Sequence, residues 1–213
     1  MSLSVTVVDY GTGNVLSVMR AIQKVGGSAH LSSDAAEIRR AGRLIVPGVG
    51  AFGPGMESLR TRGLDEALRA FAATGRPVLG ICLGMQLFAT SSEEFGAHAG
   101  LNLLPGTVVA IPSKAVDGTD LKVPLVGWAE LRQNSPGGWS GTVLGRLGEA
   151  SSVYLVHSYQ FVPSDPDDRL ADYGYGGRRI VAAVRRGNVT GCQFHPEKSG
   201  VNGLSVLSEF VRQ

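Results

Sequence analysis

A cysteine between two glycines is the residue of this chain most suited to covalent chemistry. Cys82 lies in the segment PVLGICLGMQLF, residues 77–88, with Gly80 and Gly84 on either side. A short apolar run precedes the cysteine and an amphipathic segment follows it. This order of buried strand, sharp turn and helix is that of a nucleophile elbow. The pattern predicts a thiol nucleophile at a helix N-terminus, where the thiolate is favoured; the alternative is a buried cysteine that ends a core strand.

A candidate base for this thiol lies in the C-terminal segment GCQFHPE. His195 stands directly before Pro196, which interrupts a strand's hydrogen-bond ladder, so we expect the imidazole at an edge of the sheet. Glu197 follows two residues later and is close enough to orient the ring, which makes a Cys-His-Glu triad possible. Cys192 is three residues from His195, and an odd separation along a strand puts two side chains on opposite faces. We therefore expect Cys192 to pack rather than to react.

His157 is a rival base, because the segment VYLVHSYQF also ends a strand with polar residues. No carboxylate lies near it in the sequence. The polar neighbours Ser158 and Tyr159 are better suited to recognising a substrate than to catalysis.

Acyl transfer to a thiol requires hydrogen-bond donors for the oxyanion that forms on the substrate. The backbone N–H of Leu83, next to Cys82, is one donor by position. The glycine-rich segment GVGAFGPG, residues 48–55, is the candidate for the second donor, because glycines let a backbone approach and reorient. A glycine-rich loop after a strand more often binds phosphate or is simply a turn, so this segment alone indicates little.

The composition excludes several classes of function. A net charge of +2 gives no case for binding nucleic acid or an anionic membrane. Two cysteines make no disulfide framework, and no metal-ligand spacing is present, so we expect neither a metal nor another cofactor. The opening MSLSVTVVDYG is unlike a signal peptide, and no apolar run approaches the ~20 residues of a membrane helix. A cytoplasmic location is the default expectation.

The first half of the chain alternates strands and helices. Apolar, β-branched runs predict strands at residues 4–10, 28–31, 43–48 and 77–81. Apolar residues at helical spacing predict helices between them, after the GTGN turn, after Asp34 and around Leu64–Phe71. This βαβα order predicts a parallel sheet with helices on both faces.

The second half is rich in strands. They are expected at 107–111, 123–131, 152–159, 169–175, 179–184 and 188–194, in antiparallel pairs that continue or flank the sheet, with loops at 91–105, 112–120 and 133–142. A last helix begins near Asn202. The expected fold class is α/β, a three-layer open, mostly parallel sheet with antiparallel strands in the C-terminal half, forming one domain over residues 1–213.

Three segments together, PVLGICLGMQLF, GCQFHPEKSG and VPGVGAF, resemble the class I (triad) glutamine amidotransferases. The motifs GxCxGxQ and HPE, in this order and at this separation, are the signature of the family's glutaminase domain. The resemblance runs from Val8 to Phe210 and implies the flavodoxin-like fold of that family. One departure is visible, because the family usually has Gly-Trp-Asn where this chain has Ala129 after Trp128. This departure puts in doubt any contact that the family's Asn side chain makes, but it does not concern the triad.

The resemblance implies a role for each matching residue. Cys82 would attack the side-chain amide of L-glutamine, His195 would carry the proton to the leaving ammonia, and Glu197 would steady the imidazolium. Val49 and Leu83, with Gly50 beside them, would supply the oxyanion donors. The residues implied in glutamine binding are Gln86, Glu94, Ser158 and Tyr159.

The segments VDYGTGN, VHSY and HPEKSG are similar to one branch of this family, which serves histidine biosynthesis. In that branch the ammonia passes to a (β/α)8-barrel cyclase, which converts the ribonucleotide PRFAR to imidazole glycerol phosphate and AICAR. The resemblance implies that this cyclase is the partner in a heterodimer, with Lys198 and Trp128 at the interface.

Three other functions are compatible with parts of the pattern. Another class I amidotransferase subunit, such as that of pyridoxal phosphate or anthranilate synthesis, would share the triad but not VDYGTGN and HPEKSG. A cysteine hydrolase acting on peptides or small esters would leave Gln86 and Glu94 idle. A flavodoxin-like binding module would not need Cys82 at all.

Overall fold

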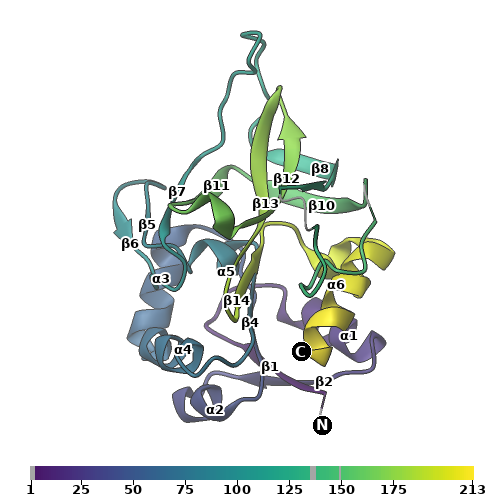
Figure 1. The fold of residues 1–213 in the computed structure, drawn as a ribbon. Coiled ribbons are helices and arrows are strands. Elements are labelled where there is room, and N and C mark those ends of the chain that lie inside the picture. The colour runs from purple at the N-terminus through teal and green to yellow at the C-terminus, as the bar shows by residue number, and fades with distance from the viewer. Residues whose placement is uncertain (1–2, 135–137, 149) are drawn as a thin grey trace.

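The computed structural model describes residues 3–134, 138–148 and 150–213. Within these ranges a large sheet forms the centre of the molecule (Figure 1). It has eight strands in the order β2-β1-β3-β4-β14-β13-β12-β9. The run from β2 to β14 is parallel, and the pairs beyond β14 are antiparallel. The strands are β1 (Ser4–Val8), β2 (Ser28–Ser32), β3 (Leu44–Val46), β4 (Val78–Ile81), β9 (Arg132–Gln133), β12 (Arg169–Tyr175), β13 (Arg178–Arg186) and β14 (Val189–Cys192).

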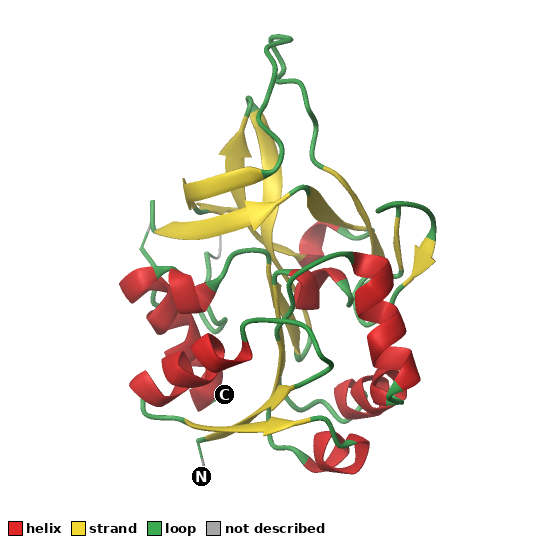
Figure 2. Cartoon of the chain, turned by 180° about the vertical axis from the view of Figure 1, so that it is seen from behind, coloured by secondary structure: helices red, strands yellow, loops and turns green. Residues whose placement is uncertain are grey.

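Helices cover both faces of this sheet, as Figure 2 shows in red. They are α1 (Val15–Lys24), α2 (Ala35–Arg40), α3 (Phe52–Thr61), α4 (Leu64–Ala72), α5 (Leu83–Gln86) and α6 (Gly200–Arg212). Apolar side chains of α1 and α6 fill one core with one face of the sheet, and those of α2, α3 and α4 fill the other. Because both faces are covered, strands such as β3 and β4 are buried throughout and have continuous apolar sequences. The predicted three-layer α/β architecture is confirmed.

Two smaller sheets flank the C-terminal half. The first pairs β8 (Leu125–Glu130) with β10 (Ser152–His157), and the second has the order β11-β7-β5-β6. The strands of the second sheet are β5 (Ser91–Ser92), β6 (His98–Ala99), β7 (Gly106–Ala110) and β11 (Tyr159–Pro163). Outside the sheets, the chain forms two short 3-10 helices, η1 (Pro166–Asp168) and η2 (Pro196–Lys198). The predicted antiparallel pairing of this half is confirmed.

The structure corrects several local predictions. The segment expected to be a loop through residue 55 becomes helical at Phe52, because Pro54 falls in the first turn, where its missing N–H costs nothing. The strand expected at 152–159 breaks at Ser158, so that β10 and β11 join different sheets. The expected loop 91–105 contains the short strands β5 and β6. The expected loop 133–142 overlaps the end of β9, and its residues 135–137 lie outside the described residues.

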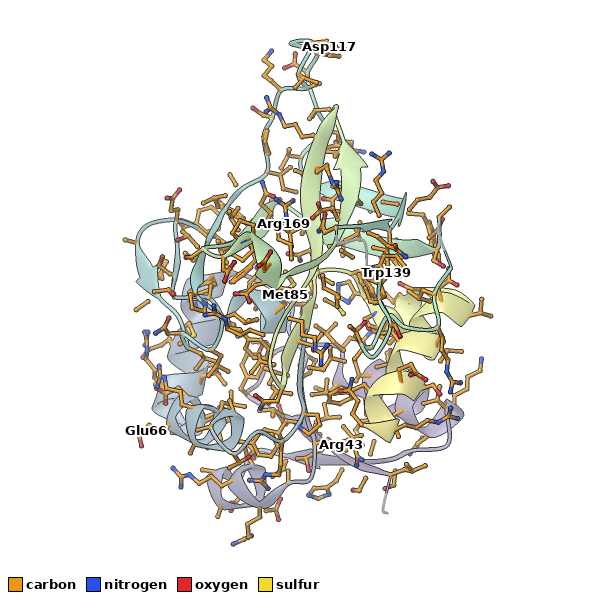
Figure 3. All side chains as sticks on the ribbon, viewed as in Figure 1. Arg43, Glu66, Met85, Asp117, Trp139 and Arg169 are labelled. Carbon is orange, nitrogen blue, oxygen red and sulfur yellow. The ribbon has the colours of Figure 1, made fainter. Side chains whose placement is uncertain are left out.

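The connection between β7 and β8 projects away from the body of the molecule, with Asp117 at its tip (Figure 3). An ion pair of 2.6 Å between Lys114 and Asp120 joins the two arms of this projection. Among the described residues, none of the helices has the length and apolar character needed to cross a membrane.

Candidate active site

Cys82 occupies a strained turn between β4 and α5. Its φ of 54° and ψ of −113° fall in a region that residues other than glycine rarely adopt. The backbone N–H of Cys82 donates to the Cys192 carbonyl at 2.8 Å, and the Cys82 carbonyl accepts from the N–H groups of Met85 and Gln86. These bonds hold the strained conformation in place, as expected of a nucleophile elbow. Helix α5 has only one turn, so its dipole contributes little to this site.

Gly80 and Gly84, on either side of Cys82, are needed for close packing and not for an unusual φ. A Cβ on Gly84 would lie 1.8 Å from the Val46 carbonyl oxygen, and one on Gly80 would lie 2.7 Å from the backbone of Met85. Met85, labelled near the centre of Figure 3, is fully buried. The glycines therefore let α5 lie directly against β3 and β4, while Cys82 itself adopts the positive φ.

His195 and Glu197 form a buried pair. The imidazole Nδ1 lies 2.9 Å from Glu197 Oε1, and both side chains are at most 3% exposed. Because a carboxylate accepts hydrogen bonds, this contact places a proton on Nδ1 and leaves Nε2 as the basic atom. The backbone also holds the histidine, since its N–H donates to the Tyr154 carbonyl at 3.0 Å. His195 lies between the end of β14 at Cys192 and the start of η2 at Pro196, so it lies at the sheet edge, as predicted.

The pKa of His195 reflects its two neighbours. Burial lowers it, but the Cys82 and Glu197 side chains outweigh burial and raise the pKa to about 9. Nε2 is buried and has no hydrogen-bond partner within the part of the chain that the structure describes. Cys82 therefore raises the pKa of the ring through its proximity, without a well-aligned hydrogen bond.

His157 is not available as a base. Its Nδ1 lies 2.8 Å from the Tyr159 carbonyl, and its Nε2 lies 2.9 Å from the Tyr173 hydroxyl. Since a carbonyl only accepts, Nδ1 carries the proton and Nε2 accepts from the phenol. Burial lowers the pKa of His157 to about 4, against the raising effect of the Tyr159 carbonyl and with a small further lowering from His195. This neutral histidine lies on the cavity wall beside His195, but both of its ring nitrogens are engaged in structural hydrogen bonds, which favours His195 as the candidate base.

This buried neutral histidine should make folding sensitive to acid. The unfolded chain binds a proton at His157 near pH 6.5, whereas the folded chain binds it only near pH 4. The contribution is therefore fully present above pH 6.5 and is lost as the pH falls toward 4, by about 1–3 kcal/mol. Urea unfolding of the chain and of His157→Gln, which keeps a donor and an acceptor but does not titrate, should show a steeper loss for the unmodified chain. Equal slopes would contradict this prediction.

One cavity of about 370 Å³ brings most of the predicted site residues together. Its walls include nine of them: Val49, Gly50, Cys82, Leu83, Gln86, Glu94, Ser158, Tyr159 and His195. The others lie outside it. Glu197 reaches the site through His195, while Trp128 and Lys198 lie on the surface.

The segment before α3 is fixed at both ends. A Cβ on Gly48 would meet the Tyr10 hydroxyl at 2.3 Å and the Leu83 Cβ at 2.9 Å, so this glycine is wedged beside the elbow. At the other end, Glu94 Oε2 accepts the backbone N–H of Phe52 at 2.7 Å and caps the helix from a distant loop. Val49 lies between these anchors and is 44% exposed. Val49 and Gly50 are thus the exposed part of this segment.

Gln193 is a site residue that sequence reasoning missed. It is fully buried, and its Nε2 donates to Cys82 Sγ at 3.7 Å while its Oε1 accepts from Gln86 Nε2 at 3.0 Å. Its position two residues before His195, in the same motif, is the signal that could have drawn attention to it.

Cys192 is a packing residue. It is fully buried within the core that α1 and α6 cover, and burial raises the pKa of its thiol. The parity argument applied to a continuous strand, whereas β14 ends at Cys192 itself. The expectation that this cysteine packs agrees with its burial.

Trp128 and Lys198 meet on the surface through Tyr154. The rings of Trp128 and Tyr154 are edge to face at 6.0 Å, and Lys198 Nζ lies 6.0 Å from the Tyr154 ring. Trp128 is 59% exposed. We call Trp128, Tyr154 and Lys198 the aromatic patch. The patch is bonded directly to the predicted base, since the Tyr154 carbonyl accepts the His195 N–H.

Known proteins resemble this chain along nearly its entire length. An imidazole glycerol phosphate synthase subunit HisH 1 of Legionella pneumophila (strain Paris) is 50% identical over 210 residues, covering 98% of this chain and 99% of the relative. A subunit HisH of Chlorobaculum tepidum is 43% identical over 208 residues, covering 97% and 98%.

Solved structures share the fold. A chain of PurLQS from Thermotoga maritima superposes with a TM-score of 0.75 at 20% identity and covers 100% of this chain and 99% of its own. A structure described as a glutamine amidotransferase gives a TM-score of 0.70 at 19% identity, with coverage of 98% and 99%. The profile of the family "Glutamine amidotransferase class-I" matches residues 6–213. With this match and relatives that align from end to end, the chain belongs to the class-I glutamine amidotransferases.

Proposed function

We propose that this chain is the glutaminase subunit of an imidazole glycerol phosphate synthase, which hydrolyses glutamine and supplies the ammonia to a cyclase subunit. Full-length relatives bear the name of that synthase. The observation that carries the proposal is a cavity that joins Cys82, at a strained elbow, to His195, whose Nδ1 is bonded to Glu197.

The three residues would act in sequence as a triad. Cys82 Sγ attacks the side-chain carbonyl carbon of glutamine, and its proton passes to His195 Nε2. The tetrahedral species collapses when His195 gives that proton to the leaving nitrogen, which departs as ammonia and leaves a glutamyl thioester. Water, deprotonated by the same Nε2, then attacks the thioester and releases glutamate and the free thiol. Glu197 holds Nδ1–H throughout and stabilises the imidazolium.

Glutamine would lie in the cavity with its α-amino group toward Glu94, the carboxylate on its wall, and with Gln86 beside it. The backbone near Ser158 and Tyr159 would complete the pocket. The Ser158 carbonyl already accepts from Ile111, and the Tyr159 carbonyl from Gln86. Contacts with glutamine on this wall would therefore use N–H and hydroxyl groups.

The oxyanion would form beside Leu83 and Val49. The N–H of Leu83 is fixed by the elbow, whereas Val49 stands in the exposed part of the segment between its two anchors. Gly50, with φ of 103° and open space around its Cβ position, makes a reorientation of this peptide inexpensive. The partner would therefore control the Val49 donor, so that glutamine is not wasted when no cyclase is bound.

The partner would be a (β/α)8-barrel cyclase that makes imidazole glycerol phosphate and AICAR from PRFAR. It would bind at the exposed aromatic patch of Trp128, Tyr154 and Lys198, next to the His195 backbone. In this chain Ala129, instead of the family Asn, packs against the core. We infer a single domain, because β14 inserts next to β4 in one sheet, and a reducing cytoplasm, which keeps a nucleophilic thiol free.

Glutaminase assays with and without the cyclase and its ribonucleotide ligand test this gating. One missing oxyanion donor typically lowers the rate by about 10²–10³, so we expect stimulation of that order when the complex is loaded. Equal rates in the free chain and the loaded complex would rule out control through Val49.

The same assays separate the alternatives. A subunit of another class I enzyme would hydrolyse glutamine but respond to a different synthase. A cysteine hydrolase would form no covalent adduct on Cys82 when offered a reactive glutamine analogue. A binding module would keep its function in Cys82→Ala.

A further inference from the structure

A chain of two buried amides connects the wall of the cavity to the sulfur of Cys82. Gln86 Nε2 donates to the Tyr159 carbonyl at 3.0 Å and to Gln193 Oε1 at 3.0 Å. Gln193 Nε2 then donates to Cys82 Sγ at 3.7 Å. Gln193 is fully buried and Gln86 is 5% exposed, so water competes little for these groups.

The donor-to-acceptor direction of these hydrogen bonds is set by the Tyr159 carbonyl. The Tyr159 carbonyl can only accept, so the amide end of Gln86 that faces it must be the NH2 group. The same NH2 group faces Gln193, which must therefore present its oxygen. The opposite end of Gln193, toward Cys82, is then NH2. Neither amide can be flipped without placing two donors or two acceptors against each other.

The sulfur has a second neighbour that prefers the other protonation state. Cys82 Sγ lies 4.0 Å from the Val156 carbonyl, which can accept a hydrogen bond from the neutral thiol. A carbonyl repels a thiolate, whereas an amide N–H attracts it. When the thiol loses its proton to His195, the Gln193 amide N–H and the imidazolium are the two neighbours that stabilise the resulting charge. The amide does so without adding a further buried charge to a site in which Cys82 is only 8% exposed.

We propose that Gln193 is a positioning residue of this active site, whose amide N–H holds the Cys82 sulfur and favours its anionic form. Its own orientation is set by Gln86 and the Tyr159 carbonyl on the glutamine-binding wall. The Gln86 and Gln193 side chains thereby link the glutamine-binding wall to the protonation state of Cys82. This role deepens the proposed glutaminase function and rests on it.

Alkylation of Cys82 by iodoacetamide provides the direct test, because it requires the thiolate but neither glutamine nor an oxyanion hole. The variant is Gln193→Met, which has similar length and no amide. The matched control is Gln160→Met, the same substitution at a buried glutamine of β11 outside the cavity. Mass spectrometry assigns the label to Cys82, and thermal melting checks that each variant is folded.

In Gln193→Met, we expect alkylation at pH 7 to slow by about tenfold and the pH profile of alkylation to move toward higher pH. In the loaded complex, kcat for glutamine hydrolysis should fall by about 10–100-fold, with KM within about threefold. Gln160→Met should change each quantity less than about twofold. Unchanged alkylation rate and profile in a folded Gln193→Met would overturn the proposal.

The alkylation and turnover results separate the two proposals. Altered alkylation in a chain that never hydrolyses glutamine would leave the role of Gln193 intact and refute the glutaminase function. Normal alkylation in an active glutaminase would do the reverse. If Gln193→Met does not fold, Gln86→Met serves instead, since it removes the donor that orients Gln193. It should slow alkylation by about threefold, and an unchanged rate there would equally overturn the proposal.

Discussion

Replacing Cys82 with alanine removes glutamine hydrolysis, with kcat falling by about 10⁴–10⁶-fold in the loaded complex. The reason is that the covalent thioester cannot form, while binding in the cavity and the oxyanion donors remain. The variant should still bind glutamine, because alanine is smaller than cysteine and does not obstruct the cavity. Steady-state ammonia release and calorimetric titration with glutamine measure the two quantities.

The matched control is Cys192→Ala, which removes the other thiol of the chain. Because Cys192 is buried in the core away from the cavity, this variant should retain its kcat and lose about 1 kcal/mol of stability. Retention of more than about one per cent of the activity in Cys82→Ala would show that another group is the nucleophile. Full loss in Cys192→Ala would contradict its structural role.

Gly84→Ala, which adds one methyl group beside Cys82, should greatly lower both stability and activity. Its Cβ would lie 1.8 Å from the Val46 carbonyl oxygen and 2.7 Å from the Val46 carbonyl carbon, both backbone atoms that cannot rotate away. Helix α5 must then move off β3. We expect the free energy of unfolding to fall by about 3 kcal/mol or more, and the displaced elbow to lower kcat by at least about 10².

Urea unfolding and ammonia release measure the two effects. Gly42→Ala is the control, because a Cβ there meets nothing within 4 Å and its φ does not require glycine. That variant should be as stable and as active as the unmodified chain. A stable and active Gly84→Ala would show that the elbow does not depend on contact between α5 and β3.

The features that were predictable from the sequence are local ones. The strand, cysteine and helix of the elbow lie within residues 77–88, and His195 and Glu197 are two residues apart, so spacing alone indicated the turn and the pair. The parallel half of the sheet followed from continuous apolar strands between amphipathic helices. The start of α3 was missed because Gly53, Pro54 and Gly55 suggest a loop, whereas these residues occupy its first turn.

The features that were not predictable depend on contacts between distant segments. Glu94 caps α3 across 42 residues, and Gln193 reaches Cys82 across 111. Neither residue type has a sequence pattern that specifies such a partner. The role of the flanking glycines also depends on such contacts, because Gly80 and Gly84 have no positive φ and instead give room for α5 against β3 and β4.

The aromatic patch shows the same limit. Lys198 and Trp128 were singled out separately, and only the pairing of β8 with β10 brings Trp128 opposite Tyr154 and so next to Lys198. The patch is therefore continuous with the backbone that holds His195. A partner that binds at this patch, as proposed, would contact Tyr154, whose carbonyl accepts the His195 N–H.

The most direct test of the central claim follows the nitrogen atom. The chain is combined with a cyclase of the (β/α)8-barrel class, PRFAR and glutamine labelled with ¹⁵N in its side-chain amide, and the imidazole glycerol phosphate is analysed by mass spectrometry. The account predicts that ¹⁵N enters the imidazole ring with the unmodified chain and that Cys82→Ala abolishes this transfer. Glutamine-derived ¹⁵N in the product with Cys82→Ala, or none with the unmodified chain, would contradict it.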